Sequence, residues 1–262
     1  MSTVVLITGA NRGLGKGLLE RYLQLPNYTI IAANRNPDHP TSKDLSKLPT
    51  ADGTKLIVVK LDARVWEDAF SAVKLLESQG IDHIDIVIAN AGVAYTWPTV
   101  AEVKLEDLVA HVEPNAYGVV SLYQATRPLL QKSKREPIYA IMGTTAGSLN
   151  LGLVADVDTL CSTQPQLPNA CYGPSKSASA WFSIRINEED SWLHSFSLSP
   201  GWVHTDLGDA GAVGLGVDKA TQDQLMIGVD ESCDGMMKVL AETTKEKHGG
   251  KLVLYSGGTM PF

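Results

Sequence analysis

Residues 3–15 read TVVLITGANRGLG, and this stretch near the N-terminus decides the fold class. Its first part, Thr3–Thr8, is short and rich in β-branched side chains, which is typical of a buried strand. Three glycines follow in the spacing G-x-x-x-G-x-G, and leucines at helical spacing begin at Leu14. The stretch therefore predicts a strand, a tight glycine turn and a helix, in that order.

The same alternation of strand and helix continues along the chain. Further strands are expected at Tyr28–Ala33, Lys55–Leu61, Ile84–Ala89, Pro137–Met142, Ser195–Ser199 and Lys251–Tyr255. Further helices are expected near Val65–Gln79, Leu105–Leu130, Tyr172–Glu189 and Glu231–Thr243. Apolar strands that alternate with helices indicate βαβ units and a covered parallel sheet. We therefore predict an α/β fold, a Rossmann-type doubly wound parallel sheet of about seven strands with helices on both faces, as a single domain over residues 1–262.

Three segments lack such a pattern. Asn34–Asp52 and Ser148–Asn169 are expected to be long loops, and loops of this length are often functional. We therefore expect Ser148–Asn169 to form a lid or a substrate wall. The glycine-rich run Gly208–Gly216 is expected to form a mobile flap.

Composition and charge narrow the class of protein. The net charge is -7, and no basic patch or stripe of the kind that indicates nucleic-acid binding is obvious. The N-terminus does not resemble a signal peptide, and no apolar run approaches the ~20 residues that span a bilayer. We therefore expect a cytoplasmic protein that binds neither nucleic acid nor membrane.

The cysteines and histidines indicate neither disulfides nor a metal site. The three cysteines are Cys161, Cys171 and Cys233, an odd number without framework spacing. None of them lies in a metal-ligand pattern with histidine. We therefore expect free thiols in a reducing compartment and no metal.

The glycine turn is suited to a dinucleotide. Glycines permit a tight turn and let the backbone approach a pyrophosphate closely. The N-terminus of the helix that follows offers unpaired N–H groups to the same anion. Its spacing differs from the common G-x-G-x-x-G fingerprint, and a plain strand-to-helix turn is the alternative interpretation.

The end of the second strand indicates which nicotinamide cofactor is bound. An acidic residue there would bind the ribose 2′-hydroxyl of NAD, whereas an arginine accommodates the 2′-phosphate of NADP. The chain reads Ala33-Asn34-Arg35 and has no acid before Asp38. Arg12 in the glycine turn would bind the same phosphate, since a guanidinium fork matches phosphate oxygens. NADP(H) is the predicted cofactor; two solvated arginines are the alternative.

Tyr172 and Lys176 form a candidate catalytic pair. They lie four residues apart in a predicted helix and therefore share one face. Reduction of a carbonyl by hydride requires a proton donor at the oxygen, and tyrosine is a weak acid with an ordinary pKa of about 10. We expect the Lys176 ammonium to lower the pKa of Tyr172. Alone, the spacing Y-x-x-x-K is equally compatible with an exposed pair on a helix.

Taken together, these motifs resemble the short-chain dehydrogenase/reductase superfamily. They are TGANRGLG at Thr8–Gly15, Asp62, NAG at Asn90–Gly92, Asn115, YGPSK at Tyr172–Lys176 and PGWVHTD at Pro200–Asp206, in this order. The resemblance extends from Val4 to about Gly258. The stretches PGWVHTDLG and ETTKEKHGGKLVLYSGG resemble more narrowly the sniffer-type carbonyl reductases and the fungal ketoreductases that reduce norsolorinic acid in polyketide pathways.

The resemblance implies a role for each matched position. Those that would form the pyrophosphate turn are Gly9, Asn11, Arg12, Gly13, Leu14 and Gly15. Those that would contact the adenine ring are Asp62 and Ala63, and those that would pass along the adenosine ribose are Asn90, Ala91 and Gly92. Those that would border the nicotinamide are Pro200, Gly201, Val203 and Thr205. Asn115 would hold a water in a proton relay behind Lys176.

The sequence departs from the family pattern at one catalytic position. The family places a serine three residues before a glycine after the fifth strand, and here Gly147 is preceded at that spacing by Thr144. Threonine keeps the hydroxyl but has a stiffer side chain. Thr145 and Ser148 are alternative candidates for this role.

The resemblance thus predicts that NADPH delivers hydride to a ketone or aldehyde, with an aromatic or polyketide-like carbonyl as the substrate. Trp97, Thr145 and Trp202 are candidate substrate contacts, and core packing is the alternative for both tryptophans. A homo-oligomer, dimer or tetramer, is possible in this family. The competing hypotheses are a non-catalytic NADP(H)-sensing or scaffolding protein and a non-redox reaction on the same fold.

Overall fold

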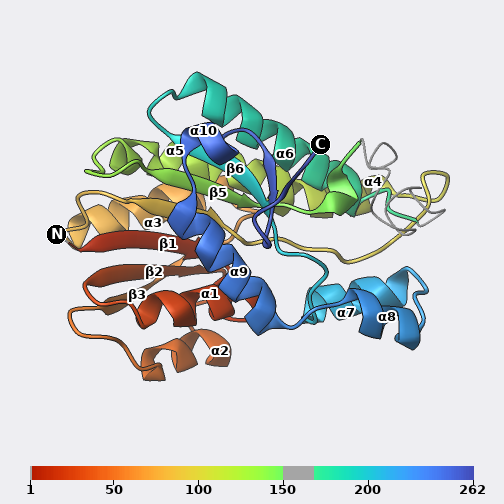
Figure 1. Ribbon diagram of the computed structural model, residues 1–262, viewed down its shortest axis with the longest axis horizontal. Coiled ribbons are helices and arrows are strands. Elements are labelled where there is room, and N and C mark those ends of the chain that lie inside the picture. The colour runs from red at the N-terminus through yellow and green to blue at the C-terminus, as the bar shows by residue number, and fades with distance from the viewer. Residues whose placement is uncertain (1, 150–167) are drawn as a thin grey trace.

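A single twisted sheet forms the centre of the molecule (Figure 1). The computed structural model describes residues 2–149 and 168–262, and within these ranges eight strands follow the order β3-β2-β1-β4-β5-β6-β7-β8. They are β1 Thr3–Thr8, β2 Tyr28–Asn34, β3 Lys55–Lys60, β4 Ile86–Ala89, β5 Ile138–Met142, β6 His194–Ser199, β7 Leu252–Leu254 and β8 Thr259–Met260. The first seven are parallel, and β8 is antiparallel to β7.

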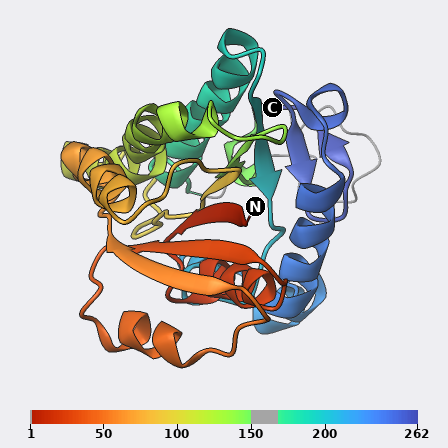
Figure 2. The ribbon, with the colours of Figure 1, turned by 90° about the vertical axis from the view of Figure 1, so that its left-hand side faces the viewer.

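Helices cover both faces of this sheet (Figure 2). The longer ones are α1 Gly13–Leu23, α3 Trp66–Ser78, α5 Gly118–Leu130, α6 Tyr172–Glu189 and α9 Val229–Glu242. The shorter ones are α2 Pro40–Lys43, α4 Leu105–Val112, α7 Asp206–Gly214, α8 Lys219–Leu225 and α10 Lys245–His248. None of the helices in the described ranges has the length and apolar character needed to cross a membrane.

The two faces of β1 bury different halves of the core. Val4 and Leu6 belong to the cluster that packs under α3, α5 and the end of α6. Val5 and Ile7 belong to the cluster that packs under α1 and α9. Because side chains alternate across a strand, a strand buried on both faces must be apolar at nearly every position, and the TVVLIT stretch meets this requirement.

The predicted fold class, a Rossmann-type sheet with helices on both faces, is confirmed. The predicted helix Tyr172–Glu189 has the bounds of α6. The sheet has one strand more than the seven expected, because the last residues turn back and Thr259–Met260 pairs with β7. A two-residue strand is too short to give an alternating pattern in the sequence.

The predicted helical stretch Leu105–Leu130 is helical over its whole length, but it is not one regular α-helix. It is divided into α4, a π-helical turn η2 over Glu113–Tyr117, and α5. Pro114 lies in the turn and has no N–H to donate to the preceding turn of helix. Wide turns of this kind are often found at functional sites, and this one contains Asn115.

Two of the expected loops contain helices. Asn34–Asp52 includes α2 and a 3₁₀ turn η1 over Asp44–Lys47, and the expected flap Gly208–Gly216 lies mostly within α7. Glycine spacing suggested a loop, but Thr205 accepts a hydrogen bond from the backbone and caps a regular helix there. Most of the third segment, Ser148–Asn169 with Cys161, lies outside the described residues.

The beginning of β6 is held by a buried polar cluster. The Thr243 hydroxyl lies 3.1 Å from Nε2 of His194 and 2.9 Å from Nδ1 of His248, and both imidazoles are 2% exposed. Burial, with smaller contributions from His248 and Lys245, lowers the pKa of His194 to about 4. The folded protein therefore keeps this imidazole neutral at pH values where an unfolded chain would protonate it.

We predict that this cluster makes the fold sensitive to acid. The pKa of His194 in the folded state lies below its unfolded value, so its contribution to stability is lost as pH falls below about 6.5. When the pH is lowered from 7 to 5, the free energy of unfolding should fall in both proteins. The fall should be about 2 kcal/mol smaller in the His194→Gln variant than in the wild type. Urea unfolding at both pH values measures this difference, and equal losses in the two proteins would contradict it.

Candidate active site

The candidate site lies at the carboxyl ends of the strands, where the order of the sheet reverses. The neighbours of β1 are β2 and β4, and the chain leaves β1 and β4 toward opposite helical layers. Open α/β sheets bind ligands in the crevice outside such a point. The motif residues that follow strand ends here are Gly9 after β1, Asp62 after β3, Asn90 after β4, Thr144 after β5 and Pro200 after β6.

The glycine turn between β1 and α1 depends on the absence of side chains. Gly9 and Gly13 have φ values of 63° and 51°, a region that favours glycine. A Cβ on Gly15 would lie 2.5 Å from Nδ2 of Asn90 and would overlap the carbonyl oxygen of Gly9. The Asn90 amide itself donates to the Thr8 carbonyl at 2.8 Å. The turn is therefore pressed against the end of β4, and the N-terminus of α1 remains directed at the crevice.

Two further contacts fix this turn to its neighbouring strands. The backbone N–H of Ala91 donates to the Thr8 hydroxyl at 2.9 Å, and that of Ala10 donates to Oδ1 of Asn34 at 2.9 Å. The amide nitrogen of Asn34 is buried and has no hydrogen-bond partner among the residues that the structure describes. An unused buried donor beside a glycine turn is suited to an acceptor on a bound molecule.

The variable residues of the turn contact segments far along the chain. Asn11 donates to the Thr41 hydroxyl of α2 at 2.6 Å. Arg12 forms an ion pair of 2.9 Å with Asp206 at the start of α7, and both side chains are largely exposed. Leu14 packs on the α1 and α9 side of the core. Asn11 and Arg12 thus connect the turn to α2 and α7.

Asp62, the predicted adenine contact, lies between two arginines. Its carboxylate accepts a hydrogen bond of 2.7 Å from Nη2 of Arg64, a residue that the motif comparison did not single out. This contact lowers the pKa of Asp62, burial opposes the shift, and Arg35 at the exposed end of β2 lowers it further. Ala63 is packed under α5, since a Cβ on Gly118 would overlap the Ala63 carbonyl oxygen.

Tyr172 and Lys176 lie on the first turns of α6, as their spacing predicted. Lys176 is only 7% exposed, and its Nζ donates to the Met142 carbonyl at the end of β5 at 2.9 Å. Its Nζ lies 5.8 Å from the centre of the Tyr172 ring. Burial lowers the pKa of Lys176 to about 8, because the charged form loses hydration.

The pKa of Tyr172 moves in the direction opposite to the one expected. Burial raises it to about 12, and interaction with the Thr144 side chain lowers it only in part. The prediction that this pKa is lowered is therefore wrong, because burial of the phenol raises it and the opposing contact is with Thr144. The Thr144 side chain, which follows β5, therefore lies at the phenol of Tyr172.

Asn169 is a residue of the site that the sequence did not identify. Its side chain donates to the Ala146 carbonyl at 3.1 Å and accepts from the Gly173 N–H at 2.8 Å. It thereby joins the 3₁₀ turn η3 over Thr145–Gly147 to the first turn of α6. An asparagine three residues before Tyr172 was the only signal in the sequence, and such spacing is too common to be informative.

Asn115 is fully buried in the turn η2, and its amide is occupied by protein groups. Its Oδ1 accepts from the Val93 N–H at 2.8 Å, and its Nδ2 donates to the Val93 carbonyl and the Ser175 hydroxyl, each at 2.9 Å. Its side chain therefore ties the segment after β4 to α6. Lys176 Nζ is close by, since a Cβ on Gly92 would lie 3.3 Å from it and 3.2 Å from Asn115 Oδ1.

The residues after β6 form the wall opposite the glycine turn. Pro200 begins a turn in which Gly201 adopts φ 81°, and Val203 is buried beyond it. Thr205 caps α7, and its methyl group would lie 3.6 Å from a Cβ on Gly13. Thr205, one of the predicted nicotinamide residues, therefore lies beside Gly13 of the predicted pyrophosphate turn.

The three candidate substrate residues have different surroundings. Trp202 donates from Nε1 to the Gly208 carbonyl at 3.1 Å, so its ring is tied to the first turn of α7. Trp97 lies against the other end of that helix, at Gly214. Thr145 is partly buried at the start of η3, next to Thr144.

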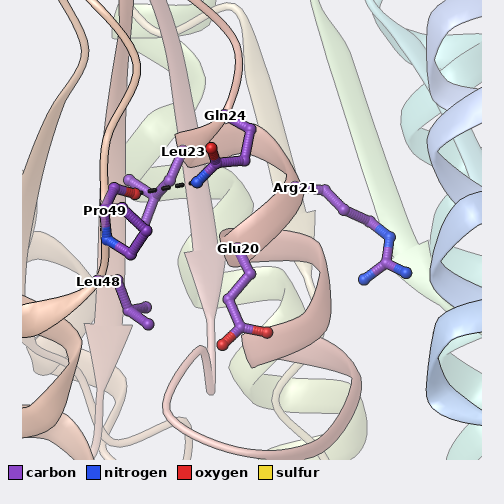
Figure 3. Close-up of a pocket in the computed structure, with 6 residues that line it drawn as sticks. All are labelled: Glu20, Arg21, Leu23, Gln24, Leu48 and Pro49. Carbon is purple, nitrogen blue, oxygen red and sulfur yellow. Dashed lines mark hydrogen bonds between the residues drawn. The ribbon is translucent and has the colours of Figure 1, made fainter.

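A surface hollow elsewhere on the molecule contains none of these residues (Figure 3). It lies between the second half of α1 and the chain that follows η1, and its lining residues are Glu20, Arg21, Leu23, Gln24, Leu48 and Pro49. Arg21 extends away from it, and the guanidinium binds Asp234 of α9 at 2.6 Å. The end of α1 lies at the amino ends of the strands, whereas the glycine turn lies at their carboxyl ends. This hollow is therefore separate from the candidate active site.

Known proteins resemble this chain over its whole length. A norsolorinic acid ketoreductase of Dothistroma septosporum is 37% identical over 259 residues, which cover 98% of this chain and 91% of that protein. A norsolorinic acid ketoreductase of Aspergillus parasiticus is 36% identical over 258 residues, which cover 98% of this chain and 90% of that protein.

Solved structures agree with this relationship. The NADPH-bound carbonyl reductase from chicken fatty liver superimposes with a TM-score of 0.80 at 26% identity, with full coverage of both chains. The carbonyl reductase Sniffer of Drosophila melanogaster, at 20% identity and a TM-score of 0.76, shares the fold, again with full coverage. The short chain dehydrogenase family profile matches residues 3–210. The chain is therefore a member of the short-chain dehydrogenase family.

Proposed function

We propose that this protein is an NADP(H)-dependent carbonyl reductase in which Tyr172 protonates the oxygen of a ketone or aldehyde. The observation that carries the proposal is the convergence of Tyr172, Lys176 and Thr144 at one end of the crevice. These three groups come from α6 and from the end of β5, and the glycine turn lies at the other end of the same crevice. This arrangement favours a reducing enzyme over a binding protein, because it supplies a proton donor where a substrate oxygen would lie.

The phenol of Tyr172 is suited to donate rather than to accept a proton. A pKa of about 12 keeps it protonated at neutral pH. The Thr144 hydroxyl can donate to the same carbonyl oxygen, so the two groups would hold it from two directions. Both hydrogen bonds become stronger as negative charge develops on that oxygen, which lowers the barrier selectively in the transition state.

Lys176 would stabilise the tyrosinate that this proton transfer leaves behind. Its pKa of about 8 keeps most of the amine charged at neutral pH, and burial prevents water from screening that charge. As the proton leaves Tyr172, attraction between ammonium and tyrosinate grows. We assign to Lys176 the return of a proton to the phenol, by way of a water held beside Asn115, whose side chain also positions the segment at Val93.

The crevice fits a nicotinamide dinucleotide. Three features of the glycine turn suit an approaching phosphate group. No Cβ fits at Gly15, and Gly9 and Gly13 have positive φ values. The amide nitrogen of Asn34 has no hydrogen-bond partner among the described residues. When bound, the nicotinamide would supply a hydride to the carbonyl carbon. The residues that would hold it are those of the glycine turn, Asn90–Gly92 and Pro200–Thr205.

Arg35 supports NADP(H) over NAD(H). It is exposed directly after β2, where the ribose of a bound dinucleotide would lie, and the sequence that follows β2 has no acidic residue before Asp38. Arg12 lies on the same turn as Gly13, and its ion pair with Asp206 is exposed, so its guanidinium remains accessible to a phosphate. The carbonyl reductase from chicken fatty liver, which shares the fold, has NADPH bound.

The relatives support a ketone as the substrate. Two of them are named norsolorinic acid ketoreductases, and we infer that this chain also reduces an aromatic or polyketide-like carbonyl compound.

The first test replaces the proton donor. Tyr172→Phe removes the phenol while keeping the ring, so kcat should fall roughly 100- to 10,000-fold while the Kd for NADPH changes little. NADPH oxidation at 340 nm with a panel of aromatic ketones and quinones measures kcat, and fluorescence titration measures Kd. The control is Tyr28→Phe at the amino end of β2, far from the candidate site, and this variant should behave as wild type. Substantial turnover by Tyr172→Phe would exclude the assigned role.

A second test addresses the cofactor. Arg35→Ser should weaken NADPH binding roughly 10- to 100-fold, because a charged hydrogen bond to the 2′-phosphate is lost. NADH lacks that phosphate, so its Kd should stay unchanged. Arg135→Ser, an exposed arginine before β5, is the matched control. If Arg35→Ser changed both Kd values equally, Arg35 would not be the phosphate ligand.

A further inference from the structure

Helix α7 presents a row of glycines on one face. Gly208, Gly211 and Gly214 recur every three residues within Asp206–Gly214, so they lie on adjacent turns of the same side. Glycine destabilises a helix interior relative to alanine. Three in one short helix therefore require a compensating contact on that side.

For Gly211 and Gly214 that contact is the indole of Trp97, which comes from the segment between β4 and α4, whereas a Cβ on Gly208 would overlap the Val203 carbonyl oxygen. A Cβ on Gly214 would overlap the ring at Cε3 and lie 2.8 Å from Cδ2 and 2.9 Å from Cζ3. A Cβ on Gly211 would lie 3.5 Å from Cζ2, an ordinary van der Waals distance. Since Cε3 and Cζ2 are opposite atoms of the six-membered ring, the ring extends along the glycine face from Gly214 to Gly211.

The segment that carries Trp97 is fixed at three points. Val93 is held by the amide of Asn115. The Tyr95 N–H donates to Nε2 of the buried His111 at 2.9 Å. The Pro98 carbonyl accepts from the N–H of Ala170, two residues before Tyr172, at 3.2 Å. Trp97 is therefore held between α7 and the residues that lead directly into the catalytic turn of α6.

We propose that Trp97, seated on the glycine face of α7, is the specificity-determining wall of the carbonyl pocket, against which an aromatic ring of the substrate stacks. This inference rests on the proposed function and names the substrate class for that site, an aryl ketone. One side of the indole is occupied by α7, and the side chain as a whole is only partly buried, so it retains surface for a ligand.

An aromatic ring is the partner that this surface selects. An indole held by backbone contacts on both flanking segments loses little freedom when a second ring stacks on it. Aromatic pairs also gain attraction beyond the apolar area that they bury. A small aliphatic aldehyde would reach Tyr172 and Thr144 without using Trp97, so the glycine face affects one class of substrate and not the other.

The experiment uses two alanine substitutions on the same helix. Gly214→Ala drives a methyl group into the indole and displaces it, whereas Gly211→Ala meets the ring at an ordinary distance. Both add the same methyl group to α7. For each variant, kcat/KM is measured at saturating NADPH with 2-acetylnaphthalene and with propanal, and calorimetry gives the Kd for 2-acetylnaphthalene in the presence of NADP⁺.

The expected result is a change confined to one variant and one substrate. Gly214→Ala should raise KM and Kd for 2-acetylnaphthalene about 5- to 10-fold, with kcat/KM for propanal within about twofold of wild type. Gly211→Ala should match wild type for both compounds. Trp97→Ala should lose at least as much as Gly214→Ala, and Trp97→Phe, which keeps a ring, should lose less.

Several outcomes would overturn the inference. They are equal effects of Gly214→Ala and Gly211→Ala, a parallel loss with propanal, and an unchanged Kd in Trp97→Ala. If Gly214→Ala did not fold, as judged by thermal melting, the comparison of Trp97→Ala with Trp97→Phe would decide by the same criteria. A wild type that oxidises NADPH with neither compound would refute the proposed function instead, and the Kd values would still decide whether Trp97 binds the aromatic ketone.

Discussion

The close approach of Gly15 to the Gly9 carbonyl and the Asn90 amide is the constraint on which the rest of the site depends. No side chain fits between these groups, so β1 and α1 meet at a fixed angle and the turn is seated on the end of β4. Backbone groups of the turn are thereby kept at the point where the strand order reverses. One glycine contact thus links the topology of the sheet to the geometry that a dinucleotide requires.

A second constraint, the burial of charge, shapes the catalytic end of the crevice. Lys176 is buried and donates a hydrogen bond to the Met142 carbonyl, and burial lowers its pKa to about 8. Tyr172 is affected by the same environment, and its pKa rises to about 12. Burial therefore favours the neutral form of both groups. This is consistent with a phenol that is kept as an acid until a substrate oxygen accepts its proton.

The sequence predicted most of the fold, because buried parallel strands must be apolar at nearly every position. Apolar runs such as TVVLIT and IVIA therefore indicate the strands directly. Motif order also singled out Tyr172 and Thr144 as candidate site residues, and the structure brings their side chains together. The spacing G-x-x-x-G-x-G implied the turn, and the structure adds the reason, the contact with Asn90.

Other features could not be predicted, because they depend on tertiary contacts. The division of Leu105–Leu130 at Pro114, the helix α7 in place of a glycine flap, and the brief strand β8 are set by packing and capping. The pKa of Tyr172 was assigned the wrong direction, since spacing reveals the neighbouring lysine but not the depth of burial. Arg64 and Asn169 were missed because their partners are known only from the fold.

We propose that Tyr172 and a bound nicotinamide together reduce a carbonyl compound. The most direct test of this proposal incubates the wild type with an aromatic ketone and NADPH that carries deuterium at both C4 positions, followed by mass spectrometry of the product. If the nicotinamide delivers the hydride, we expect an alcohol with one deuterium on the former carbonyl carbon, formed in proportion to the NADPH consumed. A product without deuterium, or NADPH that survives unchanged with every ketone tried, would contradict it.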